Sequence, residues 1–430
     1  MNYNYNLVEL FSGIGSQAKA LKNIGCKINT LGICEWDLHA FIAYDAIHES
    51  PELPEDIKAM KKDDLLLLLE KYTLSNNGKE KMEFKTLKSY SVDVLRRVYA
   101  AIRRNNNLVD VSSLQGKNMP DDIDILTYSF PCQDLSNVGA FHGYNKGIDK
   151  ESGSRSSLLW QVGRILKEMK DCKKSLPRFL LLENVPALLA DRHINNFETW
   201  IKDLQELGYI SKYFLLNARD FGLPQNRPRL LMISVFTGEN ESAKAKVQRY
   251  FDSKSPSDVV SEYVNSNYYK EIKVSDLLRI DYSNEKLRKE AIECTPNKTV
   301  SRDTIWRKNP QIIREDGTLD PKIEFVRTIT TKQDRHPNSG NLYFNSDIPG
   351  RSTFRYLTPR ECFLFMGFTD EDYDRVIEEN PNVHANNKLF PRDKLIRMAG
   401  NSIPVKLLEG IFYQILKIDA LISDNQNGCT

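Results

Sequence analysis

A cysteine held behind a proline is the residue best placed for chemistry in this sequence. Cys132 stands in Phe130-Pro131-Cys132-Gln133, just after an apolar run at residues 123–128 that predicts a buried strand. Proline fixes its own backbone angle φ, which limits how far the thiol that follows it can move. An isolated cysteine is more often a small buried hydrophobe, so Cys132 alone would predict no chemistry. The other polar groups of the chain decide between these two interpretations.

Two further groups of polar residues stand where apolar runs begin or end. Glu183 follows the run at residues 179–182, and Arg227 and Arg229 precede the run at residues 230–236. A thiol can attack a ring, a carboxyl group can supply a proton, and guanidinium groups can hold an oxygen that becomes negative. Together the three kinds of group predict a site that binds and attacks a flat polar heterocycle.

The segments that would position these groups alternate between strands and helices. Residues 6–11 predict a strand that ends in a glycine turn, and residues 17–24 predict the helix that follows. The remaining strands are predicted at residues 31–35, 123–128, 179–182 and 230–236, and further helices at residues 158–169 and 196–207. This alternation predicts an α/β fold with a doubly wound, mostly parallel sheet, whose ligands lie at the carboxyl ends of the strands.

Two segments interrupt the alternation. Residues 51–107 carry apolar positions at helical spacing, such as Val94, Val98 and Ile102, and predict a helical insertion. We favour a solubilising decoration over a partner site for this insertion. The second segment, residues 237–355, is polar and mixes basic, amide and aromatic side chains, which suit either a solvated surface or the reading of bases and phosphates.

Composition restricts the setting of the protein. The 430 residues are 40% hydrophobic and 27% charged, and the sequence has no run of ~18 apolar residues and no signal peptide. The 7 cysteines include no CxxC pair, which argues against a disulfide framework or a zinc site and for a reducing cytosol. The net charge of +2 and the isoelectric point of about 8.0 are weak signals for nucleic-acid binding, so any DNA-facing charge must be local.

Taken together and in order, the motifs resemble the cytosine-C5 DNA methyltransferase family. The resemblance runs from Leu7 to about Ile415 and is interrupted by two variable stretches. It covers Phe11 to Gly15, Glu35-Trp36, Phe130 to Gln133, Glu183 to Val185, Gln225 to Arg229, Pro359 to Cys362 and Gly400 to Ser402. Any one of these motifs is weak, and their shared order makes the resemblance specific.

The resemblance assigns the catalytic roles. Cys132 would add to cytosine C6 and make C5 nucleophilic, and Glu183 would supply the proton or hydrogen bond that N3 then needs. Arg229 would donate to the cytosine O2, with Arg227 near the ring or the backbone. The base would have to leave the duplex stack, and the glycine-rich loop after Cys132 would close over the DNA.

The resemblance also implies S-adenosylmethionine as the methyl donor. The glycine turn would approach its amino-acid end, Glu35 would accept from the ribose hydroxyls, and Trp36 would stack on adenine. The full set of expected cofactor residues is Phe11, Ser12, Gly13, Ile14, Gly15, Glu35, Trp36, Asp110, Val111, Pro131, Asn401 and Ser402. A glycine turn with a strand-end acid would equally suit a nicotinamide cofactor, and the catalytic set argues against that alternative.

Target recognition is expected within residues 298–341. Thr328-Ile329 resembles a pair that the family carries in its target-recognition domain, and the residues just after it would read bases. Lys332 and Arg335 suit guanine edges, and Gln333 and Asn338 suit adenine edges. Residues 306–308 are the next candidate. The expected DNA contacts are Gln133, Ser136, Thr328, Lys332, Gln333, Arg335 and Asn338.

The sequence thus predicts a two-domain enzyme. Residues 1–238 would form the catalytic and cofactor-binding domain, residues 239–393 a smaller irregular target-recognition domain and hinge, and residues 394–430 a return segment that completes the catalytic domain. The expected activity is cytosine-C5 methylation of a specific short duplex DNA sequence. The expected setting is the cytoplasm or nucleoid of a bacterium, within a restriction-modification system whose nuclease acts separately, with no membrane and no metal.

Two alternatives stay open. A tRNA cytosine methyltransferase would share the catalytic set, although such relatives typically carry a second proline where Phe130 stands. A non-catalytic DNA-binding regulator could keep the fold, but intact Cys132, Glu183, Arg227 and Arg229 argue against it.

Overall fold

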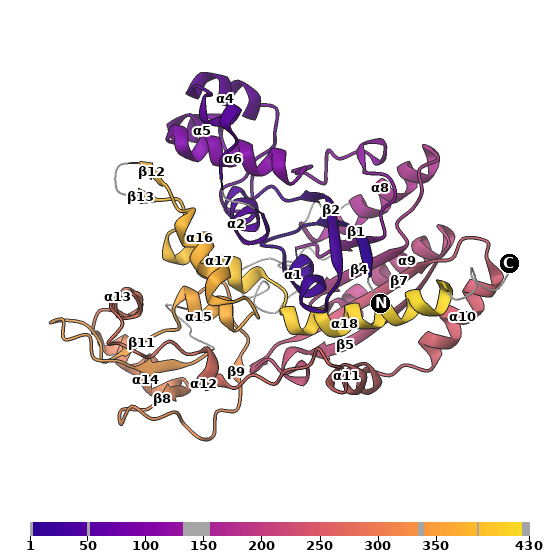
Figure 1. Ribbon diagram of the computed structural model, residues 1–430. Coiled ribbons are helices and arrows are strands. Elements are labelled where there is room, and N and C mark those ends of the chain that lie inside the picture. Colours follow the sequence, from indigo (N-terminus) through magenta and orange to yellow (C-terminus); the bar gives the residue numbers. More distant parts are fainter. Residues whose placement is uncertain (1–2, 50–51, 132–154, 334–338, 385–386, 424–430) are drawn as a thin grey trace.

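The computed structural model describes residues 3–49, 52–131, 155–333, 339–384 and 387–423 (Figure 1). Several residues singled out in the sequence lie outside the described residues. These are Cys132, Gln133, Ser136, Arg335 and Asn338.

A six-stranded sheet in the order β2-β1-β3-β4-β7-β5 organises the catalytic part of the chain. Its strands are β1 (Asn4–Leu10), β2 (Lys27–Cys34), β3 (Ile125–Tyr128), β4 (Phe179–Asn184), β5 (Tyr209–Asn217) and β7 (Pro228–Phe236). Strand β1 pairs in parallel with β2 and β3, and β3 pairs in parallel with β4. Strand β7 is antiparallel to both of its neighbours. The predicted α/β fold with a mostly parallel sheet is confirmed.

Helices cover both faces of this sheet. Because neighbouring residues of a strand point to opposite faces, Leu7 and Phe179 join one buried cluster while Val8 and Leu180 join another. The first cluster includes side chains of α1 (Ser16–Asn23), α2 (Leu38–His48), α10 (Glu241–Asp252), α11 (Pro256–Val264) and α18 (Val405–Ser423). The second includes side chains of α8 (Leu159–Asp171) and α9 (Asp191–Glu206). The result is a three-layered domain.

Strand β5 was missed in the sequence, where only the later run at residues 230–236 suggested a strand in this region. β5 lies at the edge of the sheet and carries polar or exposed residues, among them Lys212, Tyr213 and Leu215. An edge strand needs no continuous apolar run, so its signal is weaker than that of a central parallel strand.

The carboxyl-terminal helix α18 returns to the first strand and helix. Tyr5 Oη donates to Asp419 Oδ2 at 2.8 Å, and Asn23 Nδ2 donates to Glu409 Oε1 at 2.7 Å. Helices α10 and α11 pack against the same α18 (Figure 1). The division into domains remains a proposal, and these contacts favour moving its first boundary from residue 238 to a point after Val264.

The insertion is helical, as its spacing predicts. It contains α3 (Glu55–Lys58), α4 (Lys62–Leu69), α5 (Phe84–Ser89) and α6 (Val92–Arg104). Helix α6 packs on α4 and on α2, with Val94 and Val98 fully buried. These helices lie at one end of the molecule, away from the segment that carries α13 and α14 (Figure 1).

The polar segment that follows α11 is built from short elements. Its helices are α12 (Val274–Leu277), α13 (Glu285–Glu293), α14 (Val300–Lys308), α15 (Pro359–Leu364) and α16 (Asp370–Glu378). Its strands are β8 (Gln311–Ile313), β9 (Val326–Arg327), β10 (Asn341–Tyr343), β11 (Phe354–Arg355), β12 (Asn382–His384) and β13 (Asn387–Lys388). Strand β9 pairs with β6 (Gln225–Asn226), which joins this segment to the start of β7.

The remaining elements are short turns of 3-10 helix and the helix that leads into α18. The turns are η1 (Gly116–Asn118), η2 (Arg155–Leu158), η3 (Pro186–Leu189) and η4 (Ala218–Phe221), and the helix is α17 (Arg392–Asn401). A search of the described helices finds none that combines the length and the apolar character needed to cross a membrane.

Candidate active site

A cavity of about 390 Å³ opens where the parallel strands end. Phe11 follows β1, Glu35 follows β2, Phe130 and Pro131 follow β3, and Glu183 stands near the end of β4. The carboxyl ends of parallel strands meet at one edge of the sheet, and this is the expected place for a ligand. The sequence-predicted residues that line the cavity are Phe11, Gly13, Ile14, Glu35, Trp36, Asp110, Val111, Pro131, Glu183, Arg227, Arg229, Asn401 and Ser402.

A carboxyl group and a guanidinium group form the polar wall beside Pro131. Arg229 Nε lies 2.9 Å from Glu183 Oε1, and each side chain is only 12% exposed. The antiparallel register explains this approach. Glu183 pairs with Leu231, and Arg229 lies two residues before Leu231 on the same face of the sheet.

The environment of Glu183 favours its protonated form. Burial raises the pKa of Glu183, and the nearby Arg229 and Arg227 oppose this shift without cancelling it. A carboxyl group with a raised pKa keeps its proton to a higher pH than a free carboxyl group does, and it can give that proton to a ring nitrogen. The geometry therefore suits the role that the sequence predicts for Glu183.

Arg227 is used differently from Arg229. Its Nη1 donates to the backbone oxygen of Ile329, and its Nη2 donates to those of Gly400 and Ser402, each at 2.8 Å. The sequence left open whether Arg227 acts on the ring or on the backbone, and these hydrogen bonds go to the backbone. Arg227 therefore joins the start of β7 to the polar segment and to the end of α17.

The other end of the cavity is built around Glu35. The backbone N–H of Gly13 donates to Glu35 Oε2 at 3.0 Å, and that of Asp37 donates to Oε1 at 2.9 Å. Burial, followed by the charge of Asp37, raises the pKa of Glu35 to about 7 despite these donors. Trp36 and Asp110 line the same end. This region combines a carboxylate, an indole ring and a glycine turn.

Ser12 and Gly15 are not among the described residues that line the cavity. Ser12 is buried, and Gly15 adopts a positive φ of 79° against α2. A Cβ atom on Gly15 would come within 2.2 Å of His48 Nε2, so glycine is needed here for space as well as for conformation. Ser12 and Gly15 support the turn, and a direct contact of either residue with the cofactor stays a prediction.

The residues that line or support this wall include four that were not singled out in the sequence. Asp37, Gly78 and Arg397 line the cavity, and Asn107 holds the backbone of Glu35. Asp37 follows Glu35-Trp36, and Arg397 precedes Gly400-Asn401 by a few positions, so adjacency to known motifs could have suggested these two. Gly78 and Asn107 belong to the insertion, and no motif points to them.

The expected base-reading residues that the structure describes lie apart from this cavity. Thr328 Oγ1 donates to the backbone oxygen of Asn226 at 2.7 Å and so stabilises the β6–β9 joint. Lys332 is exposed at a second cavity of about 250 Å³. Gln333 is 1% exposed, and its amide bonds Ser339 and the backbone oxygen of Thr330. The prediction that Gln333 reads a base edge disagrees with this burial, because its polar atoms are used inside the loop.

Within the described ranges, no group of three or more histidine, cysteine, aspartate or glutamate side chains could hold a metal ion.

Comparison with known proteins identifies the family. The family described as C-5 cytosine-specific DNA methylase matches residues 78–417. The chain belongs to this family and is a DNA cytosine-C5 methyltransferase, which confirms the resemblance seen in the motifs. Use of S-adenosylmethionine as methyl donor follows from the family and the fold.

Two curated relatives match nearly the whole chain. The type II methyltransferase M2.ScrFI of Lactococcus lactis subsp. cremoris is 30% identical over 415 residues, which are 95% of this chain and 98% of the relative. The orphan methyltransferase M.SssI of Spiroplasma monobiae is 32% identical over 411 residues, which are 95% of this chain and 96% of the relative. Such coverage leaves no large part of either relative unmatched.

Among solved structures, the S. pombe Dnmt2 methyltransferase shares the fold, with a TM-score of 0.57 at 17% identity. The match covers 96% of this chain and 98% of that one. The Entamoeba histolytica methyltransferase EhMeth gives a TM-score of 0.53 at 15% identity, with 97% and 98% covered.

Proposed function

We propose that this protein methylates cytosine C5 in a specific short duplex DNA sequence, through a covalent bond between Cys132 and a cytosine flipped out of the duplex. The observation that carries the proposal is the Glu183–Arg229 pair in the wall of a cavity that also contains Pro131 and Glu35. Pro131 directly precedes Cys132 in the chain. One cavity thus contains the groups that would bind the cytosine ring, the residue next to the proposed nucleophile, and the residues that would bind the cofactor.

The chemistry assigned to the polar wall starts with the thiolate of Cys132. Its sulfur forms a bond to C6, and the C5–C6 electron pair shifts to C4–C5 while the C4–N3 pair moves onto N3. Glu183 gives its proton to N3, and Arg229 donates to O2, so the added charge is stabilised. C5 then takes the methyl group, whose former bonding pair stays on the donor sulfur. Finally a base removes the C5 proton, the C5–C6 double bond forms again as the thiolate leaves, and N3 returns its proton to Glu183.

The other end of the cavity fits S-adenosylmethionine by its donor and acceptor set. Glu35 would accept from the ribose hydroxyls, Trp36 would stack on adenine, and the turn around Gly13 would face the amino-acid end. Asp110 would accept from the adenine amine, and Asn401 and Ser402 would close the site. When bound, S-adenosylmethionine supplies the electrophilic methyl group.

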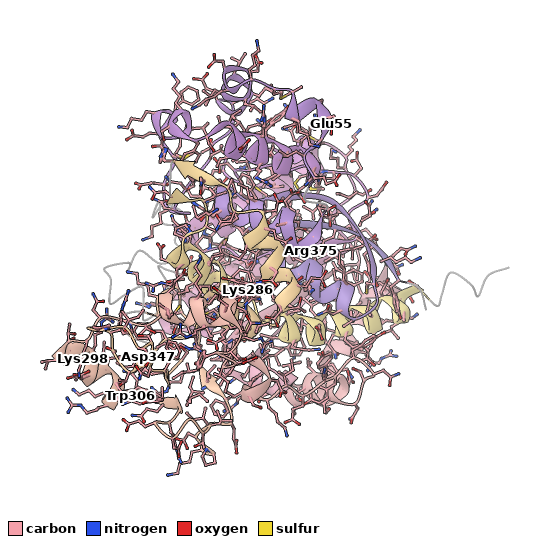
Figure 2. All side chains as sticks on the ribbon, turned by 60° about the vertical axis from the view of Figure 1, so that its left-hand side comes forward. Glu55, Lys286, Lys298, Trp306, Asp347 and Arg375 are labelled. Carbon is pink, nitrogen blue, oxygen red and sulfur yellow. The ribbon has the colours of Figure 1, made fainter. Side chains whose placement is uncertain are left out.

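The DNA-facing surface is assigned to the polar segment. Lys298 and Trp306 lie at one end of the molecule, and Glu55 of the insertion lies at the opposite end (Figure 2). Trp306 stacks on Phe354 with ring centroids 5.4 Å apart, and helix α14, which carries it, has no buried residue. A helix with exposed basic residues, here Arg307 and Lys308, at the end of an enzyme suits contacts to DNA. A role within a restriction-modification system, beside a separate nuclease, completes the proposal.

Trapping the covalent adduct tests this mechanism. Duplex DNA with 5-fluorocytosine at the target position has no C5 proton to lose, so a denaturation-resistant protein–DNA adduct should accumulate with S-adenosylmethionine present. Cys132→Ser should give no adduct and should lower turnover by about 10³-fold or more, because a hydroxyl is a far weaker nucleophile. Failure of the unaltered enzyme to form the adduct would argue against the covalent route. Methylation of tRNA instead of DNA would favour the tRNA alternative.

A further inference from the structure

The helical insertion holds the backbone that presents the cofactor residues. Asn107, just after α6, is 5% exposed, and its side-chain amide bonds both backbone groups of Glu35. Glu35 N donates to Asn107 Oδ1 at 3.1 Å, and Asn107 Nδ2 donates to Glu35 O at 2.9 Å. This paired contact fixes the end of β2 from one side.

A loop of the same insertion holds the next residues from the other side. Ser75 N donates to the backbone oxygen of Trp36 at 2.8 Å, and Leu38 N donates to the backbone oxygen of Ser75 at 2.9 Å. Ser75 is fully buried, and its hydroxyl accepts from Gly78 N at 3.0 Å and donates to Glu80 O at 2.6 Å. Ser75 therefore both shapes its loop and fastens it to the segment that carries Trp36.

The loop then reaches the cavity itself. Gly78 lines the cavity with a positive φ of 64°, and a Cβ atom there would lie 3.1 Å from Asp37 Oδ2. Any side chain at Gly78 would be strained and would press on Asp37.

Arg397 of α17 joins the loop to the strand end. Its Nη2 donates to Asp37 Oδ2 at 2.7 Å, and its Nη1 donates to the backbone oxygen of Asn77 at 2.8 Å. Both charged side chains are largely buried, with 19% of Arg397 and 11% of Asp37 exposed. A two-pronged guanidinium suits this double contact better than an ammonium group does.

We propose that the insertion is a working part of the cofactor site, in which residues 75–80 and Asn107 hold Glu35 and Trp36 in place and Arg397 is the positioning residue that locks the loop. The inference rests on the proposed binding of S-adenosylmethionine at this end of the cavity. It replaces the expectation that the insertion only decorates the surface. The insertion makes hydrogen bonds to the segment that carries Glu35 and Trp36. An insertion that only covered the surface would not need these hydrogen bonds.

Binding of S-adenosylmethionine to purified full-length variants tests the proposal. Calorimetry should show the affinity of Arg397→Met lowered by about tenfold or more, since two charge-assisted hydrogen bonds are lost. Arg397→Lys should fall between this variant and the unaltered protein. The KM for S-adenosylmethionine should rise with little change in kcat, and the affinity for target DNA should stay unchanged.

Arg103→Gln is the matched control, because Arg103 belongs to the same insertion and its ion pair with Asp56 is exposed. Its affinity for S-adenosylmethionine should equal that of the unaltered protein. Gly78→Ala provides a second perturbation of the loop that leaves Arg397 in place, and it should weaken cofactor binding. Because alanine at a positive φ also lowers stability, binding is measured at a temperature at which this variant is fully folded.

The outcomes separate the two claims. If the unaltered protein binds no S-adenosylmethionine, the proposed cofactor site itself fails. If it binds, and folded Arg397→Met and Gly78→Ala bind within twofold of it, the role of the insertion is overturned. Hydrogen exchange adds a direct readout, because residues 74–82 should exchange more slowly once S-adenosylmethionine is bound.

Discussion

The cavity wall and the polar segment between α11 and α17 differ in how far buried ion pairs add to apolar packing. Around the cavity, the strands of the sheet place several functional side chains at strand ends, and the two buried clusters fix the sheet. In the polar segment, apolar side chains such as Ile312, Leu342 and Phe363 join the first cluster, and buried ion pairs add to this packing. Arg355 binds Glu361 through two hydrogen bonds of 2.7 and 2.8 Å, and both side chains are 0% exposed.

The ion pairs also join three helices of this segment, α13, α15 and α16, to one another. Arg360 contacts Glu290, Asp370 and Asp374, which lie on or beside α13 and α16. Glu361 accepts from the backbone N–H of Thr358 at 2.8 Å and so caps α15 as well. Burial alone would lower the pKa of Arg355, and the Glu361 carboxylate outweighs burial, so the pKa lies above its ordinary value.

In the proposed function, this difference corresponds to a division between chemistry in the cavity and DNA recognition in the polar segment. Substitutions at the strand ends of the sheet would disrupt the site. Loops attached to the buried ion pairs of the polar segment can change their sequence and stay attached. The comparison makes a general prediction. Changes in the cavity wall should affect turnover or cofactor binding, and changes in the polar segment should affect stability or sequence preference.

The largest expected effect is on turnover, for Glu183→Gln. The change keeps the shape of the side chain and removes the proton offered to N3, so turnover should fall by ~10²–10⁴-fold with little loss of DNA affinity. Because the pKa of Glu183 is raised, the rate of the unaltered enzyme should fall as the pH rises through that pKa, and the variant should lose this dependence. Single-turnover rates across a range of pH measure the loss of turnover and its pH dependence. Glu241→Gln is the control, because Glu241 is exposed. A main effect on S-adenosylmethionine affinity would show that Glu183 belongs to the other end of the cavity.

Arg355→Met tests how much the buried ion pair stabilises the polar segment, because it leaves the Glu361 carboxylate buried without its main partner. Such a change should lower the free energy of unfolding by ~3–5 kcal/mol, measured by urea denaturation. Arg314→Gln breaks a more exposed pair with Asp320 in the same segment and should cost at most ~1 kcal/mol. Equal losses in the two variants would mean that the buried pair carries no special share of the stability.

Arg335→Ala should alter sequence preference and leave S-adenosylmethionine binding unchanged. Loss of a contact to a guanine edge should relax discrimination at one base position by ~1–3 kcal/mol. Gln333→Ala should act differently, because the buried amide of Gln333 holds the loop, and it should weaken methylation of all sequences alike. Methylation of a library with randomised sites, read by sequencing, compares the two variants. A wild-type profile from Arg335→Ala would move the search to residues 306–308.

The smallest expected effect concerns pH and cofactor binding. The carboxylate form of Glu35 accepts hydrogen bonds best, and its pKa is about 7, so affinity for S-adenosylmethionine should rise with pH through about 7 and then level off. The change should be within about tenfold, which corresponds to one pKa unit. Calorimetry from acid to alkaline pH should show a flat, weaker profile for Glu35→Gln. An equal pH dependence in this variant would assign the titration to another group.

The sequence by itself determined the elements and residues whose signals are local. Strands that end in reactive or acidic residues, the glycine turn and the order of the motifs predicted the α/β sheet, the family and most of the cavity wall. Glu183, Arg229, Glu35, Asp110 and Asn401 all line one cavity, as predicted. For Glu35 and Glu183 the prediction succeeds because a parallel sheet brings its strand ends together. For Arg229, Asp110 and Asn401 it rests on the order of the motifs.

Only the tertiary structure decided the contacts between segments far apart in the chain. Arg227 bonds the backbone of Ile329 and Gly400 while it also lines the cavity, and Gln333 is buried in its loop. The edge strand β5 carries only a weak local signal, and the bracing of Glu35 by Asn107 carries none. In each case the partner is a backbone group or a surface made by another part of the fold. Side-chain type and spacing predict what a residue can bind, and the folded chain determines which partner lies within reach.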